Sequence, residues 1–113
     1  MSEECGVEEV AAVLEDECAR TILASTSERP MSVEDLAERC DASKPTIYRR
    51  IDDLRACDML AARTRPDDEG HHYEVYSARL DRVTVELADG EFDLHVERTE
   101  DMSDRFTRLI EEM

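Results

Sequence analysis

The sequence predicts an α+β fold, with capped helices in its first half, two β-hairpins after them and one more helix at the end. Apolar residues recur at helical spacing up to about residue 58. From residue 59 onward, short runs of β-forming residues follow one another. Asp89-Gly90 lies between two segments that alternate apolar and polar residues, which is the strongest short signal for a hairpin. We expect one domain over residues 1–79 and an appendage over residues 80–113.

The first two helices are predicted from short apolar stripes. The first stripe consists of Val7, Val10, Ala11, Val13 and Leu14. Residues 17–25 continue as a second helix that turns Cys18 and Ile22 inward, and Pro30 ends the helical segment. The pattern leaves open whether the chain breaks near Asp16.

Two further helices each carry their own start signal. Ser32 and Asp35 form a capping box for a third helix, and its apolar positions are 33, 36, 37 and 40. Ser43 caps a fourth helix that extends to about residue 58, with Pro45 in its first turn. About three residues join the two helices, which is the helix-turn-helix spacing. Asp41 stands in the turn where glycine is commonest, and aspartate tolerates the left-handed conformation better than most residues.

The second half of the chain predicts two hairpins and a helix. A short strand over residues 59–65, a polar turn and a strand over residues 71–77 follow the fourth helix directly, so residues 63–76 are expected to form the wing of a winged helix. The Asp89-Gly90 turn joins the strands of the second hairpin. Thr99 then caps a last helix, whose apolar face comprises Met102, Phe106, Leu109, Ile110 and Met113.

The charge of the chain is strongly acidic and unevenly distributed. The net charge is −16, from 30 acidic and 14 basic residues, and Lys44 is the only lysine. Scarce lysine beside abundant carboxylates resembles the composition of haloarchaeal proteins, although an acidic protein that avoids nucleic acid is the alternative. Residues 44–65 hold six basic and three acidic residues, a local charge of +3. This basic segment favours nucleic-acid binding.

The sequence predicts neither a membrane-spanning segment nor a signal peptide. No apolar run approaches the roughly 18 residues of a membrane span, and the acidic N-terminus does not resemble a signal peptide. We therefore expect a soluble, cytoplasmic protein without membrane contact. In that compartment the four cysteines are expected to be small buried hydrophobic residues.

Residues 18–77 resemble the winged helix-turn-helix of ArsR-type transcriptional regulators in a haloarchaeal version. The resemblance rests on Cys18–Leu23, Ser32–Ala37, Ser43–Ile51 and the Arg63, Gly70 and Tyr73 positions of the wing, and it covers about half of the chain. It implies a homodimer that binds double-stranded DNA, with the recognition helix over residues 43–58 in the major groove. Metal-sensing members carry a Cys-x-Cys pair where this chain has Ser32-Val33-Glu34, so no metal is expected there.

The candidate DNA contacts are exposed polar and basic side chains of the fourth helix and the wing: Ser43, Lys44, Thr46, Tyr48, Arg49, Arg50, Arg63, Arg65 and His72. Arg49 lies about 200° around the helix from Ile47, so it should point away from the core toward a base edge. Lys44 and the helix N-terminus suit phosphate. The alternatives are partial core packing for Tyr48, an ion pair from Arg50 to Asp53 or Glu34, and plain surface exposure for His71 and His72.

Several function classes remain open beside DNA binding. Nothing in the sequence has the pattern of a catalytic triad, a phosphate-binding loop or a metal site, so we expect neither an enzyme nor a cofactor. An acidic winged helix could instead bind a protein partner, with Asp52, Asp53 and Asp67 neutralising the basic segment. A redox-responsive regulator using Cys18, Cys40 or Cys57 is another alternative. The apolar stripes at 7–14 and 102–113 favour a homodimer, and the target sequence, the direction of regulation and any effector are not predicted.

Overall fold

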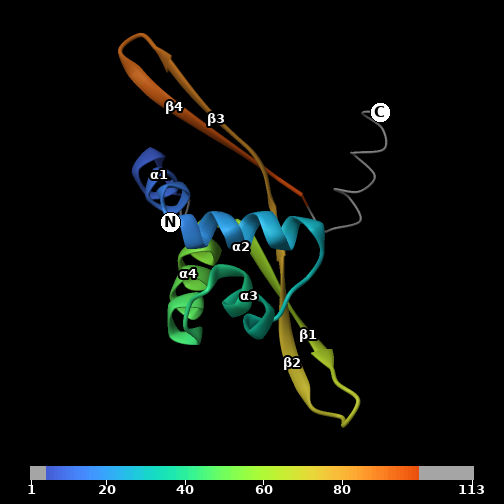
Figure 1. The fold of residues 1–113 in the computed structure, drawn as a ribbon. Helices are drawn as coiled ribbons and strands as arrows, with labels where there is room; N and C mark the ends of the chain where they lie inside the picture. The colour runs from blue at the N-terminus through green and yellow to red at the C-terminus, as the bar shows by residue number, and fades with distance from the viewer. Residues whose placement is uncertain (1–4, 100–113) are drawn as a thin grey trace.

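The computed structural model describes residues 5–99 and shows an α+β chain, with four helices and two antiparallel hairpins in that range (Figure 1). This confirms the α+β class that the sequence predicts. The elements are α1 (Val7–Glu15), α2 (Glu17–Glu28), α3 (Val33–Cys40), α4 (Lys44–Ala56), β1 (Leu60–Pro66), β2 (His72–Ala78), β3 (Leu80–Ala88) and β4 (Glu91–Arg98). The helix predicted after Thr99 lies outside the described residues. None of the described helices is long and apolar enough to cross a membrane.

The break between α1 and α2 is real and is made by Asp16. Its backbone is extended, and its carboxylate Oδ2 accepts a hydrogen bond of 2.8 Å from the Ala19 N–H. Asp16 is therefore the N-cap of α2, since it satisfies one of the amides that a helix start leaves unpaired. At the start of α1, Glu9 accepts in the same way from the Gly6 N–H.

The caps of α3 and α4 form as the sequence predicts. Ser32 and Asp35 each accept from the other's backbone N–H, which completes a capping box. Asp41 has φ 52° and ψ 49°, so it adopts the left-handed conformation that ends α3. Ser43 caps α4 through the Thr46 N–H at 3.4 Å. These local signals fix where each helix begins and how tightly the chain turns between them.

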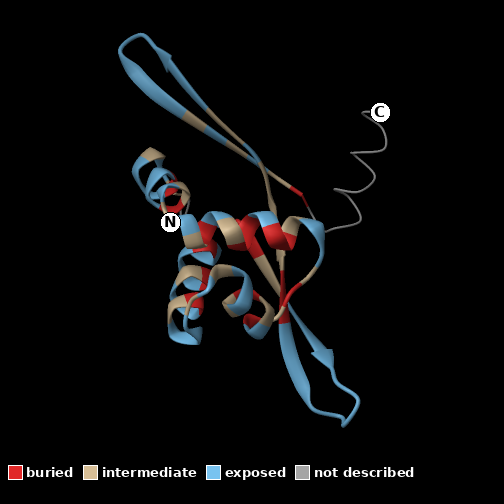
Figure 2. Cartoon of the chain, in the orientation of Figure 1, coloured by how far each residue is buried: buried red, intermediate tan, exposed pale blue. Residues whose placement is uncertain are grey.

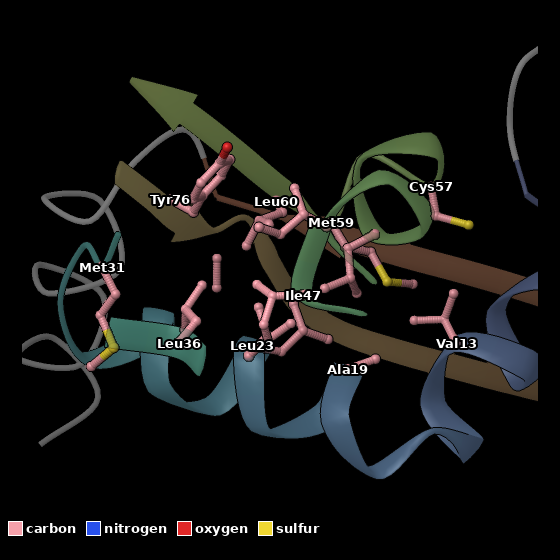
Figure 3. Packing of buried hydrophobic residues seen from close by; sticks show 14 of the residues in the cluster. Val13, Ala19, Leu23, Met31, Leu36, Ile47, Cys57, Met59, Leu60 and Tyr76 are labelled. Atoms are coloured by element: carbon pink, nitrogen blue, oxygen red, sulfur yellow. The ribbon is translucent and has the colours of Figure 1, made fainter. Parts of the chain in front are cut away.

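The core lies where α2, α3 and α4 pack against the bases of β1 and β2 (Figure 2). Figure 3 shows Leu23, Leu36 and Ile47 in this cluster, and Leu36 and Ile47 have no exposed surface. Met31 and Tyr76 exchange backbone hydrogen bonds of 3.0 and 2.8 Å, which tie the α2–α3 connection to β2. Consequently the exposed face of α4 is held at a fixed orientation relative to the first hairpin.

The two hairpins project in opposite directions from this core (Figure 1). The β1–β2 hairpin pairs Leu60 with Ala78 at its base and Pro66 with His72 near its tip. The β3–β4 hairpin, which we call the arm, pairs Leu80 with Arg98 at its base and turns at Asp89-Gly90. Both turn residues have positive φ, 54° and 79°, as a two-residue hairpin turn requires. The predicted Asp-Gly hairpin is confirmed.

Candidate nucleic-acid interface

A groove of about 570 Å³ separates the start of α4 from β2. Its walls come from the beginnings of α3 and α4 on one side and from the first hairpin on the other. The lining residues are Ser32, Val33, Glu34, Lys44, Tyr48, Asp67, His72, Tyr73, Glu74 and Tyr76. Three of the predicted contacts, Lys44, Tyr48 and His72, are therefore brought to one place.

The N-terminal half of α4 offers a polar face that points away from the core. Ile47 is fully buried on one side of the helix, whereas Tyr48 is 52% exposed and Arg49 is exposed on the other. One Arg49 guanidinium nitrogen donates to Thr46 Oγ1 at 3.4 Å, and Ser43 Oγ donates to the same oxygen at 3.1 Å. Within residues 5–99, Arg49 makes no ion pair with a carboxylate. Its charge is thus available to a ligand.

Lys44 is partly neutralised by a neighbouring helix. Its Nζ lies 3.5 Å from Glu34 Oε1, and both side chains are largely exposed. An exposed pair of this kind contributes at most about 1 kcal/mol, because water and salt screen it. Lys44 can therefore exchange Glu34 for a stronger anion, such as a phosphate group.

Arg50 belongs to the framework of the domain rather than to its exposed surface. Its Nε donates to Asp16 Oδ2 at 3.0 Å, and its Nη1 lies 3.7 Å from Asp53 Oδ2. The predicted alternative of an ion pair is correct for Asp53, but the shorter contact is to Asp16, the N-cap of α2. The side chain joins α4 to the α1–α2 junction, so Arg50 is held within the fold and is not available as the predicted DNA contact.

Substitution of Asp16 separates its two roles. Asp16→Ala removes both the cap of α2 and the partner of Arg50, and we expect it to lower the free energy of unfolding by about 1–2 kcal/mol. Asp16→Asn keeps a capping oxygen, so its loss should be clearly smaller. Urea unfolding followed by circular dichroism measures both values. If the two variants lost the same free energy of unfolding, the ion pair to Arg50 rather than the helix cap would be the larger contribution of Asp16.

The first hairpin divides the remaining predicted contacts between its two faces. Arg63 is paired with Val75 and Arg65 with Tyr73, and residues paired across two strands share a face. The intervening residues of β2 face the other way, and His72 and Glu74 line the groove from that face, while Tyr73 reaches it from the face of Arg65. Arg63 and Arg65 are exposed but do not line it. The basic segment seen in the sequence is therefore spread over two surfaces.

The groove itself carries more acidic than basic residues. Glu34, Asp67 and Glu74 lie along it, against Lys44. Asp67 also shapes the hairpin turn, because its Oδ1 accepts from the backbone N–H groups of Glu69 and His71 at 2.8 Å each. A phosphate would be repelled from the groove floor, so the exposed face of α4 is the better nucleic-acid surface.

Tyr76 closes the inner end of this groove as a neutral phenol. It is 3% exposed, and its hydroxyl donates to Glu74 Oε1 at 3.3 Å. Burial is the main cause that raises the pKa of Tyr76, and the charge of Glu74 raises it further. The hydroxyl therefore remains a hydrogen-bond donor throughout the neutral range.

A disulfide between Cys5 and Cys57 was not predicted. The two Cα atoms are 5.4 Å apart, and the bond fixes the segment before α1 to the residue that ends α4. The expectation that all four cysteines are merely small buried residues is wrong for this pair. No sequence signal could have identified it, because 52 positions separate the two residues and nothing between them marks the pairing.

The other two cysteines are free thiols that lie close together. Cys40 Sγ is 3.7 Å from the carbonyl oxygen of Cys18, and both residues are half-buried. Burial, followed by the hydrogen bond to the Cys18 side chain, raises the pKa of Cys40 to about 12. Because the thiolate is the reactive form, Cys40 is a poor redox sensor at neutral pH.

Alkylation kinetics test this protection of Cys40. At pH 8 we expect iodoacetamide to label Cys40 at least about tenfold more slowly in the folded protein than in urea, where the thiol titrates near 8.5. Peptide mass spectrometry gives both rates. Because folding raises the pKa of Cys40, the neutral thiol should contribute its full share of the free energy of unfolding below about pH 8.5, where the unfolded thiol titrates, and lose it as the pH rises toward 12. Rapid labelling of the folded chain at pH 8 would contradict this assignment.

Residues 5–99 contain no group of three or more histidine, cysteine, aspartate or glutamate side chains that could hold a metal ion. Comparison with protein-family models found no match, and comparison with curated proteins found none either. The functional argument therefore rests on the geometry of the chain itself.

Proposed function

We propose that the chain is a winged helix-turn-helix transcriptional regulator that binds double-stranded DNA sequence-specifically, and that it is not an enzyme. In this proposal α3 and α4 are the helix-turn-helix, and the β1–β2 hairpin is the wing. The observation that supports it most is the exposed face of α4. There Arg49 lacks a carboxylate partner among the described residues and stands opposite the buried side chain of Ile47.

The proposed contacts follow from the chemistry of the α4 surface. The N-terminal half of α4 enters the major groove, where the Arg49 guanidinium can donate two parallel hydrogen bonds to a guanine. The Lys44 ammonium, beside the positive end of the α4 dipole, binds phosphate, which displaces Glu34 from its weak pair with Lys44. Arg63 and Arg65, on the other face of the hairpin, approach the backbone or the minor groove.

The acidic surroundings of α4 should shape how binding depends on salt. At molar salt the Debye length is about 3 Å, so long-range attraction contributes little and direct base contacts gain importance. Glu34 and Glu74 lie beside the proposed phosphate position and could share cations with the DNA. We propose that the affinity for DNA then falls less steeply with KCl concentration than counterion release alone predicts. A full slope maintained up to molar KCl would exclude bridging cations.

The proposal is tested by genome-wide immunoprecipitation of the tagged full-length chain at native salt. We expect reproducible peaks that share a twofold-symmetric sequence motif, since a twofold homodimer places two α4 helices about one DNA turn apart. An Arg49→Ala chain should lose most of these peaks. Absence of reproducible peaks with the unmodified chain would reject DNA binding.

The acidic groove favours a second candidate, a protein-interaction module. Glu34, Asp67 and Glu74 would then contact a basic peptide, with Tyr73 providing apolar surface. The two candidates differ in a simple readout. If the groove binds peptide, Glu74→Gln should weaken that binding, whereas a DNA-binding chain should keep or increase its DNA affinity after the same substitution.

The disulfide favours a third candidate, a redox-responsive variant of the same regulator. Cys5–Cys57 fixes the end of α4, the helix that carries Arg49. Mass spectrometry of the chain isolated under alkylating conditions, with and without mild oxidation, reports whether this bond changes. If Cys5 and Cys57 stay in one redox state under all of these conditions, the redox-responsive candidate is rejected.

A further inference from the structure

One face of the β3–β4 arm is entirely apolar along three successive cross-strand pairs. The pairs are Val83–Val96, Val85–Leu94 and Leu87–Phe92. Exposure increases toward the tip, where Leu87 is 66% and Phe92 63% exposed (Figure 2). The opposite face is polar, with pairs such as Glu86–Asp93. A continuous apolar surface of this kind marks a contact site.

The arm is too small to be stable without another element packed against it. An isolated two-stranded hairpin is marginally stable in water unless another element covers its apolar face. Val83, Leu94 and Val96 pack against the core, and Phe92 and Leu94 also line a cavity beside Cys5–Val7. Val85, Leu87 and Phe92 nevertheless remain more than half exposed, so another segment is needed to cover their face.

Thr99, at the base of the arm, is the last described residue before residues 100–113, the segment that the sequence offers as a cover. The residue is 1% exposed, and its N–H donates to the Arg79 carbonyl oxygen at 2.8 Å. Its hydroxyl is buried and has no hydrogen-bond partner among the residues that the structure describes. The buried position of Thr99 therefore fixes where residues 100–113 leave the base of the arm.

The predicted helix matches the apolar face in length and spacing. From Met102 to Met113 a helix rises about 16 Å, in turns of about 5.4 Å. The three apolar pairs of the arm extend over about 13 Å. In the predicted helix over residues 100–113, apolar residues recur once or twice per turn. The apolar stripe that they form can cover all three pairs of the arm.

The connection is too short for the segment to cover its own arm. A helix packed on a strand pair lies roughly 10 Å above it, because each helix is about 10 Å across. Connections from a strand to such a helix usually take about 2–6 residues. Here Thr99 alone separates β4 from the predicted helix. A second copy has no such restriction.

We propose that residues 100–113 of one copy dock on the apolar face of the arm of a second copy, and that two chains exchange these segments in a homodimer. Exchange of identical elements is an established route to twofold dimers. Both surfaces are acidic: residues 100–113 carry five acids and two arginines, and the arm carries six acids and two arginines. The contact is therefore apolar, and salt should strengthen it by screening the repulsion.

Photo-crosslinking of the full-length chain tests this contact directly. We would incorporate p-benzoylphenylalanine in place of Phe92, mix unlabelled and ¹⁵N-labelled chains, irradiate, and identify crosslinked peptides by mass spectrometry. We expect peptides from residues 100–113 crosslinked to the arm, with mixed isotope labels. Crosslinks to residues 100–113 of the same chain only, or to the arm of the partner only, would overturn the proposal.

A pair of adjacent substitutions provides the matched control. Leu87→Glu places a charge on the apolar face, whereas Ala88→Glu places the same charge on the opposite face of the same strand. By light scattering, Leu87→Glu should raise the dimer dissociation constant at least about tenfold, moving the mass toward the 13.0 kDa of one chain. Ala88→Glu should leave it unchanged. Equal effects would contradict the proposed face, and neither readout depends on DNA binding.

Discussion

Cys5→Ser is expected to lower the free energy of unfolding by about 4 kcal/mol under oxidising conditions. The disulfide to Cys57 closes a loop across 52 positions, and the lost conformational entropy of a loop of that length raises the free energy of the unfolded chain by roughly this much. Cys5 is the better position to change, because Cys57 is 4% exposed and lies in the core cluster. Guanidinium unfolding of both chains, with and without dithiothreitol, measures the difference.

The control for this prediction is the reductant itself. In dithiothreitol the unmodified chain should lose nearly the same stability, and Cys5→Ser should lose nothing further. Cys18→Ser should not abolish the effect of the reductant, since Cys18 is a free thiol. An unmodified chain whose unfolding midpoint is insensitive to the reductant would show that the bond contributes nothing in solution.

The same experiment separates stability from regulation. Arg98 also holds the end of α4, through hydrogen bonds of 3.0 Å to the Cys57 carbonyl and 2.9 Å to the Asp58 carbonyl. With this second anchor present, reduction should weaken the fold without moving the exposed face of α4. A large change in DNA affinity on reduction, at a temperature where the chain stays folded, would instead support the redox-responsive candidate.

Local signals explain why the helix and hairpin boundaries could be predicted from the sequence. Ser32, Ser43 and Asp89-Gly90 each act over two to four residues, and each makes the cap or turn that its residue type favours. The burial of Ile47 and the exposure of Arg49 follow from helical spacing alone. These features need no knowledge of the rest of the fold.

Contacts between distant segments could not be predicted in the same way. Arg50 could have paired with any neighbouring carboxylate, and only the packing of α4 against the α1–α2 junction selects Asp16, 34 positions away. The Cys5–Cys57 bond depends on the same packing. The opposite faces of Arg65 and His72 depend on strand register, and a slip of one residue would pair them on the same face.

Arg49→Ala is expected to weaken binding to a cognate DNA site about 5- to 150-fold, the equivalent of about 1–3 kcal/mol for a bidentate arginine–guanine contact. The substitution should leave the fold intact, because the side chain is exposed and it donates only a weak 3.4 Å hydrogen bond, to Thr46 Oγ1. Fluorescence anisotropy with a labelled duplex from an immunoprecipitated site measures the affinity. Circular dichroism verifies the fold.

Arg82→Ala is the matched control for charge. It removes the same charge from the arm, where Arg82 is largely exposed and lies 3.8 Å from Glu97. If general electrostatics governed binding, the two variants would lose similar affinity; a base contact requires the loss to be confined to Arg49. Arg49→Lys refines the test, because lysine retains the charge but cannot form the paired hydrogen bonds. We expect Arg49→Lys to lose discrimination at one base pair while keeping much of the nonspecific affinity, a combination that a phosphate contact would not produce.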